Sequence, residues 1–152
     1  MAKNKLRLKI ITPDNTKFDD EAELVIVRTI EGEIGFMANH MACSSVLDYG
    51  ALRMIDDGFE RRIAVFGGIA QMRDNVLTVL ANDAQWPEDI DLALVEAERE
   101  QTERRLQESV DDLEIQRDQV LMRRTLVQIE VSSYPLISSG GANDGNAAKE
   151  SE

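Results

Sequence analysis

The sequence has few of the residues from which disulfides and metal sites are built: its 152 residues include one cysteine and one histidine. A lone Cys43 excludes an intrachain disulfide, and Cys43 with His40 cannot supply the four ligands of a structural zinc site. We therefore expect a reducing compartment and no cofactor. No run approaches the roughly 20 apolar residues of a membrane span, and the N-terminus lacks the apolar core of a signal peptide, so we expect a chain that is neither inserted nor exported.

Basic residues are also scarce, at 17 Lys and Arg against 29 Asp and Glu, for a formal net charge of −12. This balance argues against binding of nucleic acid, which needs a stripe of Lys and Arg to neutralise phosphates. We therefore expect any partner of this chain to be a protein rather than a nucleic acid. The acidity is concentrated in residues 87–132, which hold 6 basic and 13 acidic residues, whereas residues 1–86 hold 10 and 13.

Residues 1–86 contain short apolar runs separated by turn residues, as strands do. The clearest runs are 6–11, 23–30, 63–72 and 75–82, and we expect 40–48 to be an irregular link between strands. Many short strands without a helical insert predict an antiparallel β-sandwich or barrel. A domain of about 80 residues is marginally stable without partners.

Two glycine pairs mark special backbone positions within this region. In TIEGEIGFMANH, residues 29–40, Gly32 and Gly35 predict a turn with positive φ angles between two strands. In AVFGGIAQM, Gly67 and Gly68 interrupt an apolar run, which predicts a bulge or a close backbone approach inside a strand.

Residues 87–132 change to a helical apolar period, with a boundary near Pro87. We expect Asp89 to cap a first helix and residues 108–112 to make a turn into a second helix. The first helix has two neighbouring apolar stripes: the better one is Ile90, Leu94 and Ala97, and the other is Leu92, Val95, Thr102 and Leu106. Two helices joined by a short loop should lie antiparallel. Because their apolar stripes are narrow, we expect the hairpin to be held weakly and to be movable.

The last segment, residues 133–152, is rich in Gly, Ser, Ala and Asn and has no apolar period. Such a composition predicts disorder in isolation. The expected organisation is therefore a β-sandwich over 1–86, a helical hairpin over 87–132 and a disordered tail over 133–152.

Catalytic interpretations are weak. His40 with Ser44, Ser45 and Asp48 has the residue types of a hydrolytic triad, but no nucleophile-elbow sequence is present, so a small hydrolase stays a distant alternative. Adjacent carboxylates on a glycine-rich turn, as at residues 31 and 33, are usually only solvated. No GKS or GKT follows the second glycine pair, which excludes a phosphate loop.

Taken in order, the segments 29–40, 64–72 and DIDLALVEAE at 89–98 resemble the epsilon subunit of F-type ATP synthases, and the resemblance runs from about residue 6 to 132. It implies a non-catalytic central-stalk (rotor) subunit that couples gamma to the c subunit ring in ion-driven ATP synthesis, with the coupling ion, proton or sodium, left open. It further implies alpha and beta as partners of the hairpin, and a peripheral location at the cytoplasmic side of the cell membrane through the complex.

The resemblance assigns the rotor and c-ring interface to the glycine-rich turn and the histidine that follows it: Glu31, Gly32, Glu33 and His40. The family usually has proline and glycine just before this histidine, where the present sequence has Ala38 and Asn39. A turn that only closes the sandwich is the alternative interpretation of these residues.

In the hairpin, the resemblance implies that Arg117, Arg123 and Arg124 contact the catalytic subunits and inhibit ATP hydrolysis. The net charge of −7 over residues 87–132 opposes docking on an acidic surface, so we expect weak inhibition. The alternative is a solvated helix face.

Some bacterial members bind ATP through an I/L-D-x-x-R-A motif. Ile90 and Asp91 match it, and a further arginine of that site is retained as Arg124, but Leu94 and Val95 replace its arginine and alanine; Gln101 and Gln128 also stand where arginines assist. Because a phosphate chain needs those cations, we expect weak or absent ATP binding. A free-standing nucleotide-sensing module built on the same hairpin is the main alternative function.

Overall fold

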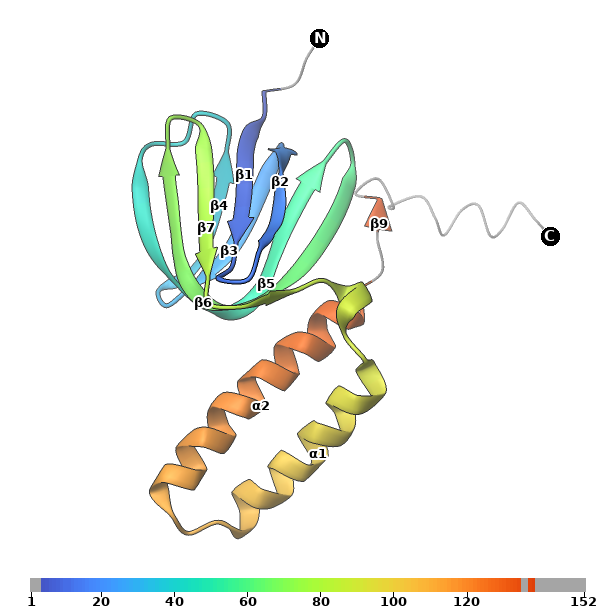
Figure 1. The fold of residues 1–152 in the computed structure, drawn as a ribbon. Coiled ribbons are helices and arrows are strands. Elements are labelled where there is room, and N and C mark those ends of the chain that lie inside the picture. The colour runs from blue at the N-terminus through green and yellow to red at the C-terminus, as the bar shows by residue number, and fades with distance from the viewer. Residues whose placement is uncertain (1–3, 135–136, 139–152) are drawn as a thin grey trace, which may run out of the picture.

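The computed structural model describes residues 4–134 and 137–138 and shows a β-sandwich from one end of which a two-helix hairpin extends (Figure 1). This arrangement confirms the predicted fold class, a β-sandwich followed by an antiparallel helical hairpin. The elements in chain order are β1 (Leu6–Ile11), β2 (Thr16–Ala22), β3 (Leu24–Thr29), β4 (Gly32–Met37), β5 (Cys43–Asp56), β6 (Phe59–Arg73), β7 (Val76–Ala81), β8 (Ala84–Gln85), a 3-10 turn η1 (Pro87–Asp89), α1 (Leu92–Glu108), α2 (Asp112–Ser132) and β9 (Ile137–Ser138).

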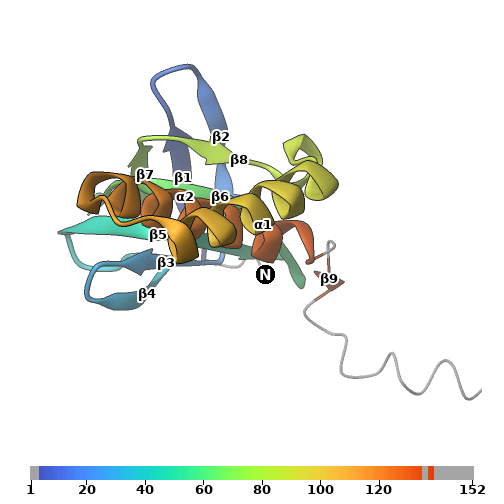
Figure 2. The same ribbon diagram turned by 90° about the horizontal axis from the view of Figure 1, so that it is seen from below.

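The sandwich is one sheet folded over on itself, in the order β2-β1-β7-β6-β5-β3-β4. The long strands β5 and β6 each belong to both layers: the second half of β6 pairs with β7, whereas the second half of β5 pairs with β3 (Figure 2). The pairing of β1 with β7 is parallel, and the other pairs are antiparallel. Because β2 and β4 remain as edges, the sheet does not close into a barrel.

Two glycines make the bend of β6 possible. Gly67 and Gly68 have φ angles of +78° and +131°, which side chains with a Cβ atom rarely adopt. A Cβ on Gly68 would also overlap the carbonyl oxygen of Leu80 and lie 2.8 Å from the Cα of Ala81. The predicted close backbone approach at this glycine pair is therefore confirmed.

Three local predictions for the sandwich need correction. Of the first glycine pair, only Gly32 has a positive φ, at +122°; both glycines lie within β4, and the turn is formed by residues 30–31. The expected irregular link over 40–48 is mostly strand, since β5 begins at Cys43 and pairs with β6 from its first residue. The prediction also missed β2, whose acidic run has little apolar alternation but pairs with β1 along its whole length.

The core of the sandwich follows from simple alternation. In β1, Leu6, Leu8 and Ile10 are fully buried while the residues between them face outward. Phe36 from β4 and Leu77 from β7 complete the same cluster from other strands. The strands of both layers thus share one continuous apolar interior.

The first helix begins two residues later than predicted. Pro87 opens a 3-10 turn that includes Asp89, and the carboxylate of Asp91 accepts the capping hydrogen bond from the backbone N–H of Leu94 at 3.2 Å. The predicted capping role of Asp89 is therefore wrong. The turn between the helices is confirmed, with Asp111 accepting a hydrogen bond from Leu113 N–H at 3.1 Å.

The helices bury a different face from the better predicted stripe of α1. Val95 and Thr102 are buried on α1, whereas Leu94 is 66% exposed. On α2 the buried residues are Thr125, Val127, Gln128 and Val131. Neither helix is long and apolar enough to cross a membrane within the part of the chain that the structure describes.

The predicted disorder of 133–152 falls mostly on residues 135–136 and 139–152, which lie outside the described residues. The described part differs from that prediction, because residues 137–138 form β9, which pairs with the start of β6.

Candidate interaction surfaces

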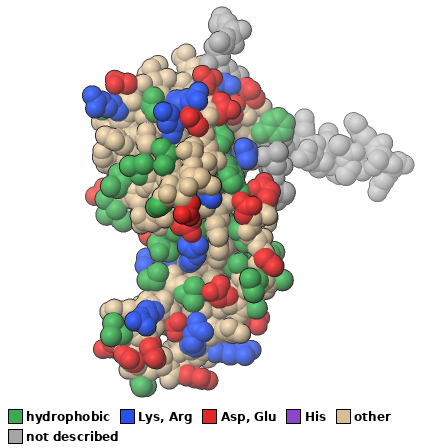
Figure 3. Space-filling view, in the orientation of Figure 1, with side chains coloured by type: hydrophobic (Ala, Val, Ile, Leu, Met, Phe, Trp, Pro, Cys, Tyr) green, Lys and Arg blue, Asp and Glu red, His purple; other side chains and the backbone are tan. Residues whose placement is uncertain are grey.

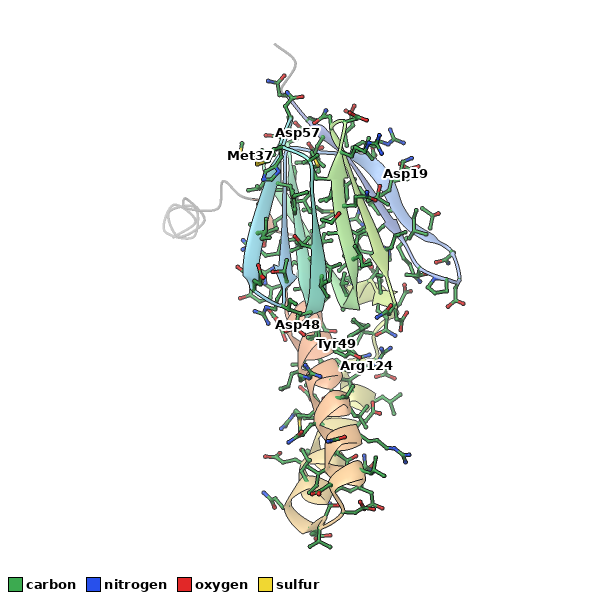
Figure 4. The ribbon with its side chains drawn as sticks, turned by 90° about the vertical axis from the view of Figure 1, so that its left-hand side faces the viewer. Asp19, Met37, Asp48, Tyr49, Asp57 and Arg124 are labelled. Carbon is green, nitrogen blue, oxygen red and sulfur yellow. The ribbon has the colours of Figure 1, made fainter. Side chains whose placement is uncertain are left out.

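The four residues predicted at the rotor interface lie at two ends of the sandwich. Glu31, in the turn after β3, and Gly32 and Glu33, at the start of β4, lie at the end near the hairpin, where Thr29 pairs with Leu47. His40 follows β4 at the opposite end, where Figure 4 shows Met37 far from the hairpin. β4, whose first two residues are Gly32 and Glu33, runs from one end to the other, and its six residues span about 17 Å. The structure therefore brings the first three together but not the fourth.

His40 occupies a turn and makes local contacts. Its backbone N–H donates to the carbonyl of Met37 at 3.2 Å, its Nδ1 lies 2.8 Å from the carbonyl oxygen of Met41, and its ring meets Phe36 edge-on at 4.9 Å between centroids. Among the described residues, no contact joins His40 to the serines of β5 or to Asp48, which lies beside the hairpin (Figure 4). A hydrolytic triad is not assembled.

An apolar row crosses the outer face of the layer that contains β7. The sequence analysis did not predict it. Val46, Ile69 and Leu80 are 52%, 49% and 47% exposed and lie directly opposite one another on β5, β6 and β7. We call these three residues the outer stripe. Ile30, 65% exposed, is the next residue along from Val46, because its backbone N–H donates to the carbonyl of Val46. The available signal was the run VLTVLA, in which the outward-facing positions of β7 are also apolar except for Thr78.

A second apolar cluster attaches the hairpin to the sandwich. Val127 and Val131 of α2 pack against Ala51, Ala64 and Phe66, which lie on β5 and β6 next to their bends. The small alanines let the helix approach the sheet closely. Figure 3 shows further apolar side chains on the surface of both the sandwich and the hairpin.

Polar contacts surround this cluster. Arg124 donates to Asp83 at 2.7 Å and lies 4.0 Å from the centroid of the Phe66 ring. Gln128 of α2 donates to the side-chain oxygen of Gln85 at 2.6 Å. We call the Arg124–Asp83 and Gln128–Gln85 pairs the polar clasp, which joins α2 to the segment after β7.

The three predicted arginines of α2 differ in their surroundings. Arg123 lies 3.7 Å from the carboxylate of Asp48 and 5.3 Å from the centroid of the Tyr49 ring, so it also faces the sandwich (Figure 4). Arg124 belongs to the polar clasp. Arg117, near the tip of the hairpin, has no hydrogen bond or ion pair to any described residue. Two of the three therefore hold the hairpin in this conformation.

The residues that match the nucleotide motif have structural roles. Ile90 packs against the apolar cluster under α2, Asp91 caps α1, and Arg124 is paired with Asp83. Val95, which stands where the motif has alanine, is buried, and the exposed Leu94 replaces its arginine. Among these described residues the one cation, Arg124, is already paired with Asp83.

One carboxylate cluster has the spacing of a metal site. Oxygen atoms of Glu23, Asp56 and Asp57 lie within 4.8 Å of one another. The ammonium of Lys5 is 2.9 Å from Asp56 and 3.5 Å from Asp57, so an internal cation already neutralises part of the charge of this cluster. These contacts raise the pKa of Lys5, chiefly through the Asp56 hydrogen bond.

Comparison with known proteins identifies the family. The family described as ATP synthase, Delta/Epsilon chain, beta-sandwich domain matches residues 5–87. The ATP synthase epsilon chain of Alkaliphilus oremlandii is 40% identical over 103 residues, 68% of this chain and 77% of that one. The epsilon chain of Syntrophomonas wolfei is 31% identical over 137 residues, 90% of this chain and 100% of that one.

A solved structure shares the fold. In the Euglena gracilis mitochondrial ATP synthase (OSCP/F1/c-ring), one chain matches with a TM-score of 0.75 at 21% identity, covering 86% of this chain and 82% of that chain. An epsilon chain is an accessory subunit, so the expectation of a subunit that is not itself an enzyme is confirmed together with the resemblance. The chain belongs to the ATP synthase delta/epsilon chain family, among the epsilon chains.

Proposed function

We propose that this chain is the non-catalytic central-stalk subunit that joins gamma to the c subunit ring in ion-driven ATP synthesis. The observation that carries the proposal is the outer stripe, where three aliphatic side chains on adjacent strands are each about half exposed. Contiguous exposed apolar side chains of this kind mark surfaces that bind proteins. The next row on the same face, Ser44, Gln71 and Thr78, is polar and bounds the apolar row.

We assign the outer stripe to gamma. A rotor subunit has to transmit torque without slipping, so its contact with gamma should bury apolar side chains held on a rigid sheet. All three residues of the stripe stand on strands that are paired on both sides, which fixes their spacing.

The contact with the c ring is assigned to the open edge of the sandwich. β4 is an edge strand that joins Glu31–Glu33 at one end to His40 at the other. An interface that runs along β4 can include both groups, although they lie at opposite ends of a strand that spans about 17 Å. Attachment to the cytoplasmic side of the cell membrane would then occur only through the complex.

Inhibition of hydrolysis through the hairpin requires a change of partners. Arg123 and Arg124 face Asp48 and Asp83 in this conformation, so they reach a catalytic subunit only after the hairpin leaves the sandwich. Their internal pairing and the acidity of the hairpin both favour weak inhibition.

The first test is co-expression with gamma from the same genome, followed by size-exclusion chromatography with light scattering. A stable one-to-one complex is expected, and Ile69→Lys should abolish it because a charge would be buried in the interface. Leu94→Lys, at an exposed site on the hairpin, is the matched control and should leave the complex intact. Two separate peaks for the unaltered proteins would contradict the proposal.

Calorimetry with ATP and the isolated chain distinguishes the proposed function from the alternative, a nucleotide-sensing module. No saturable heat is expected at millimolar ATP, since only one cation of the motif is retained. Tight binding without gamma would instead support a nucleotide-sensing module.

A further inference from the structure

The residues that follow α2 return to the sandwich. The ring centroid of Tyr134 lies 3.6 Å from the guanidinium carbon of Arg62, a residue of β6. Three residues later, β9 pairs antiparallel with the start of β6, with Phe59 opposite Ser138 and Glu60 opposite Ile137. The chain therefore makes two successive contacts with β6 directly after the helix ends.

These contacts cover an edge of the sheet. The first half of β6 has β5 on one side, and on its other side only the short strands β8 and β9 pair with it in the described part of the chain, as Figure 1 shows for β9. β8 pairs at residues 64–65 and β9 at 59–60. Unpaired strand edges expose backbone donors and acceptors, so β9 satisfies groups that would otherwise be open.

Tyr134 rests on a guanidinium that is already held in place. Arg62 donates to Glu60 at 3.0 Å, and Arg53 donates to the other oxygen of Glu60 at 2.6 and 2.9 Å. The Arg62 side chain is only 13% exposed. Because Glu60 holds this cation in place and the docked side chain is largely shielded from water, its stacking with Tyr134 is stronger than that of a free surface arginine.

The start of the hairpin is anchored to the same strand. β8 pairs with β6 just before η1 leads into α1. We propose that Tyr134 and β9, which we call the strap, anchor the other end and so restrain the hairpin from leaving the sandwich. The four Cα-to-Cα steps from Ser133 to Ile137 span at most about 14 Å, so the end of α2 stays near the sandwich while β9 is paired. The inference concerns the free chain and does not depend on gamma or the c ring.

The test is hydrogen exchange measured by mass spectrometry on the full chain and on a chain that ends at Ser133. Removing the strap should speed exchange of residues 125–132 about five-fold or more, while exchange in β1 and β7 stays the same. A chain that ends at Gly140 keeps β9 and is the matched control, with no change expected.

A point substitution tests the strap without truncation. Tyr134→Ala should speed exchange of the same residues about two- to five-fold, and Tyr134→Phe, which keeps the ring, should not. The comparison of Tyr134→Ala with Tyr134→Phe tests the role of the strap even if the truncated chain also loses protection from exchange in the sandwich.

The proposal is overturned if the truncated chain and Tyr134→Ala both exchange like the full chain while Arg124→Ala, which breaks the polar clasp, exchanges faster. That result would show that the assay detects release of the hairpin and that the strap does not oppose it.

Discussion

The sandwich and the hairpin are held together by different means. In the sandwich, strands from both layers surround a continuous interior in which Leu8, Phe36 and Leu77 are fully buried. On α1 only Val95 and Thr102 are buried, and α2 is attached through one small apolar cluster, the polar clasp, the contacts of Arg123 and the strap. The sandwich therefore has a core of its own, whereas the position of the hairpin depends on a few contacts that can be removed one at a time.

The largest effect should come from Gly68→Ala in the sandwich. The new Cβ would overlap the Leu80 carbonyl at a φ of +131°, and neither the backbone of β6 nor that of β7 can move without breaking their pairing. We expect the free energy of unfolding in urea to fall by about 2–4 kcal/mol. Gly35→Ala, which meets only side chains at 3.6 Å or more, should cost far less. If the two substitutions lowered the free energy of unfolding equally, this explanation of the bend in β6 would be wrong.

Val131→Ala should release the hairpin without unfolding the sandwich. Val131 is completely buried against the sheet, and its loss should weaken docking of α2 by about 1.5–3 kcal/mol. Faster hydrogen exchange in α2 with unchanged exchange in β1 is the expected measurement. Leu126→Ala, at a site that is 50% exposed, serves as the control. If β1 exchanged faster too, the two regions would be one cooperative unit.

The polar clasp should contribute less than the apolar cluster. The Arg124 and Asp83 side chains are 29% and 40% exposed, so solvent screens their pairing. A double-mutant cycle with Arg124→Ala and Asp83→Ala, read by the same exchange measurement, should give a coupling of about 0.5–1 kcal/mol. A coupling near zero would leave the apolar cluster as the main attachment.

Acid should destabilise the folded chain through Glu60, whose carboxylate accepts hydrogen bonds from Arg53 and Arg62. Burial alone would raise the pKa of this carboxyl, but the hydrogen bonds from Arg53 and Arg62 outweigh burial and hold the pKa below its ordinary value. The stabilisation from Glu60 is therefore complete above the ordinary carboxyl range and is lost as pH falls through the depressed pKa. We expect unfolding monitored by Tyr and Trp fluorescence to show a smaller acid dependence in Glu60→Gln. An unchanged acid dependence would rule out this contribution.

Local chemistry allowed much of the fold to be predicted. Alternation in β1, the glycine pair of β6 and the change of apolar period near Pro87 are signals that act over a few residues, and each led to the correct kind of element. The helix start was predicted less well, because Asp89 and Asp91 are equally good capping residues. The choice between them depends on the 3-10 turn at Pro87.

The candidate surfaces were harder to predict. The resemblance placed Glu31, Glu33 and His40 in one interface. The path of β4, however, carries His40 to the opposite end of the sandwich from the two glutamates. The outer stripe was missed because Val46, Ile69 and Leu80 come from three different segments. They become neighbours only through the register of β5, β6 and β7.

The sequence alone determined that a β-rich region precedes a helical hairpin and that the chain resembles epsilon subunits, because period, turn residues and short motifs are local properties. Only the tertiary structure decided which partners the arginines of α2 have. Arg124 and Asp83 are 41 residues apart in the chain, and they meet because the bends of β5 and β6 place α2 beside the segment after β7. Contacts at that separation depend on the whole path of the backbone, which no short stretch of sequence encodes.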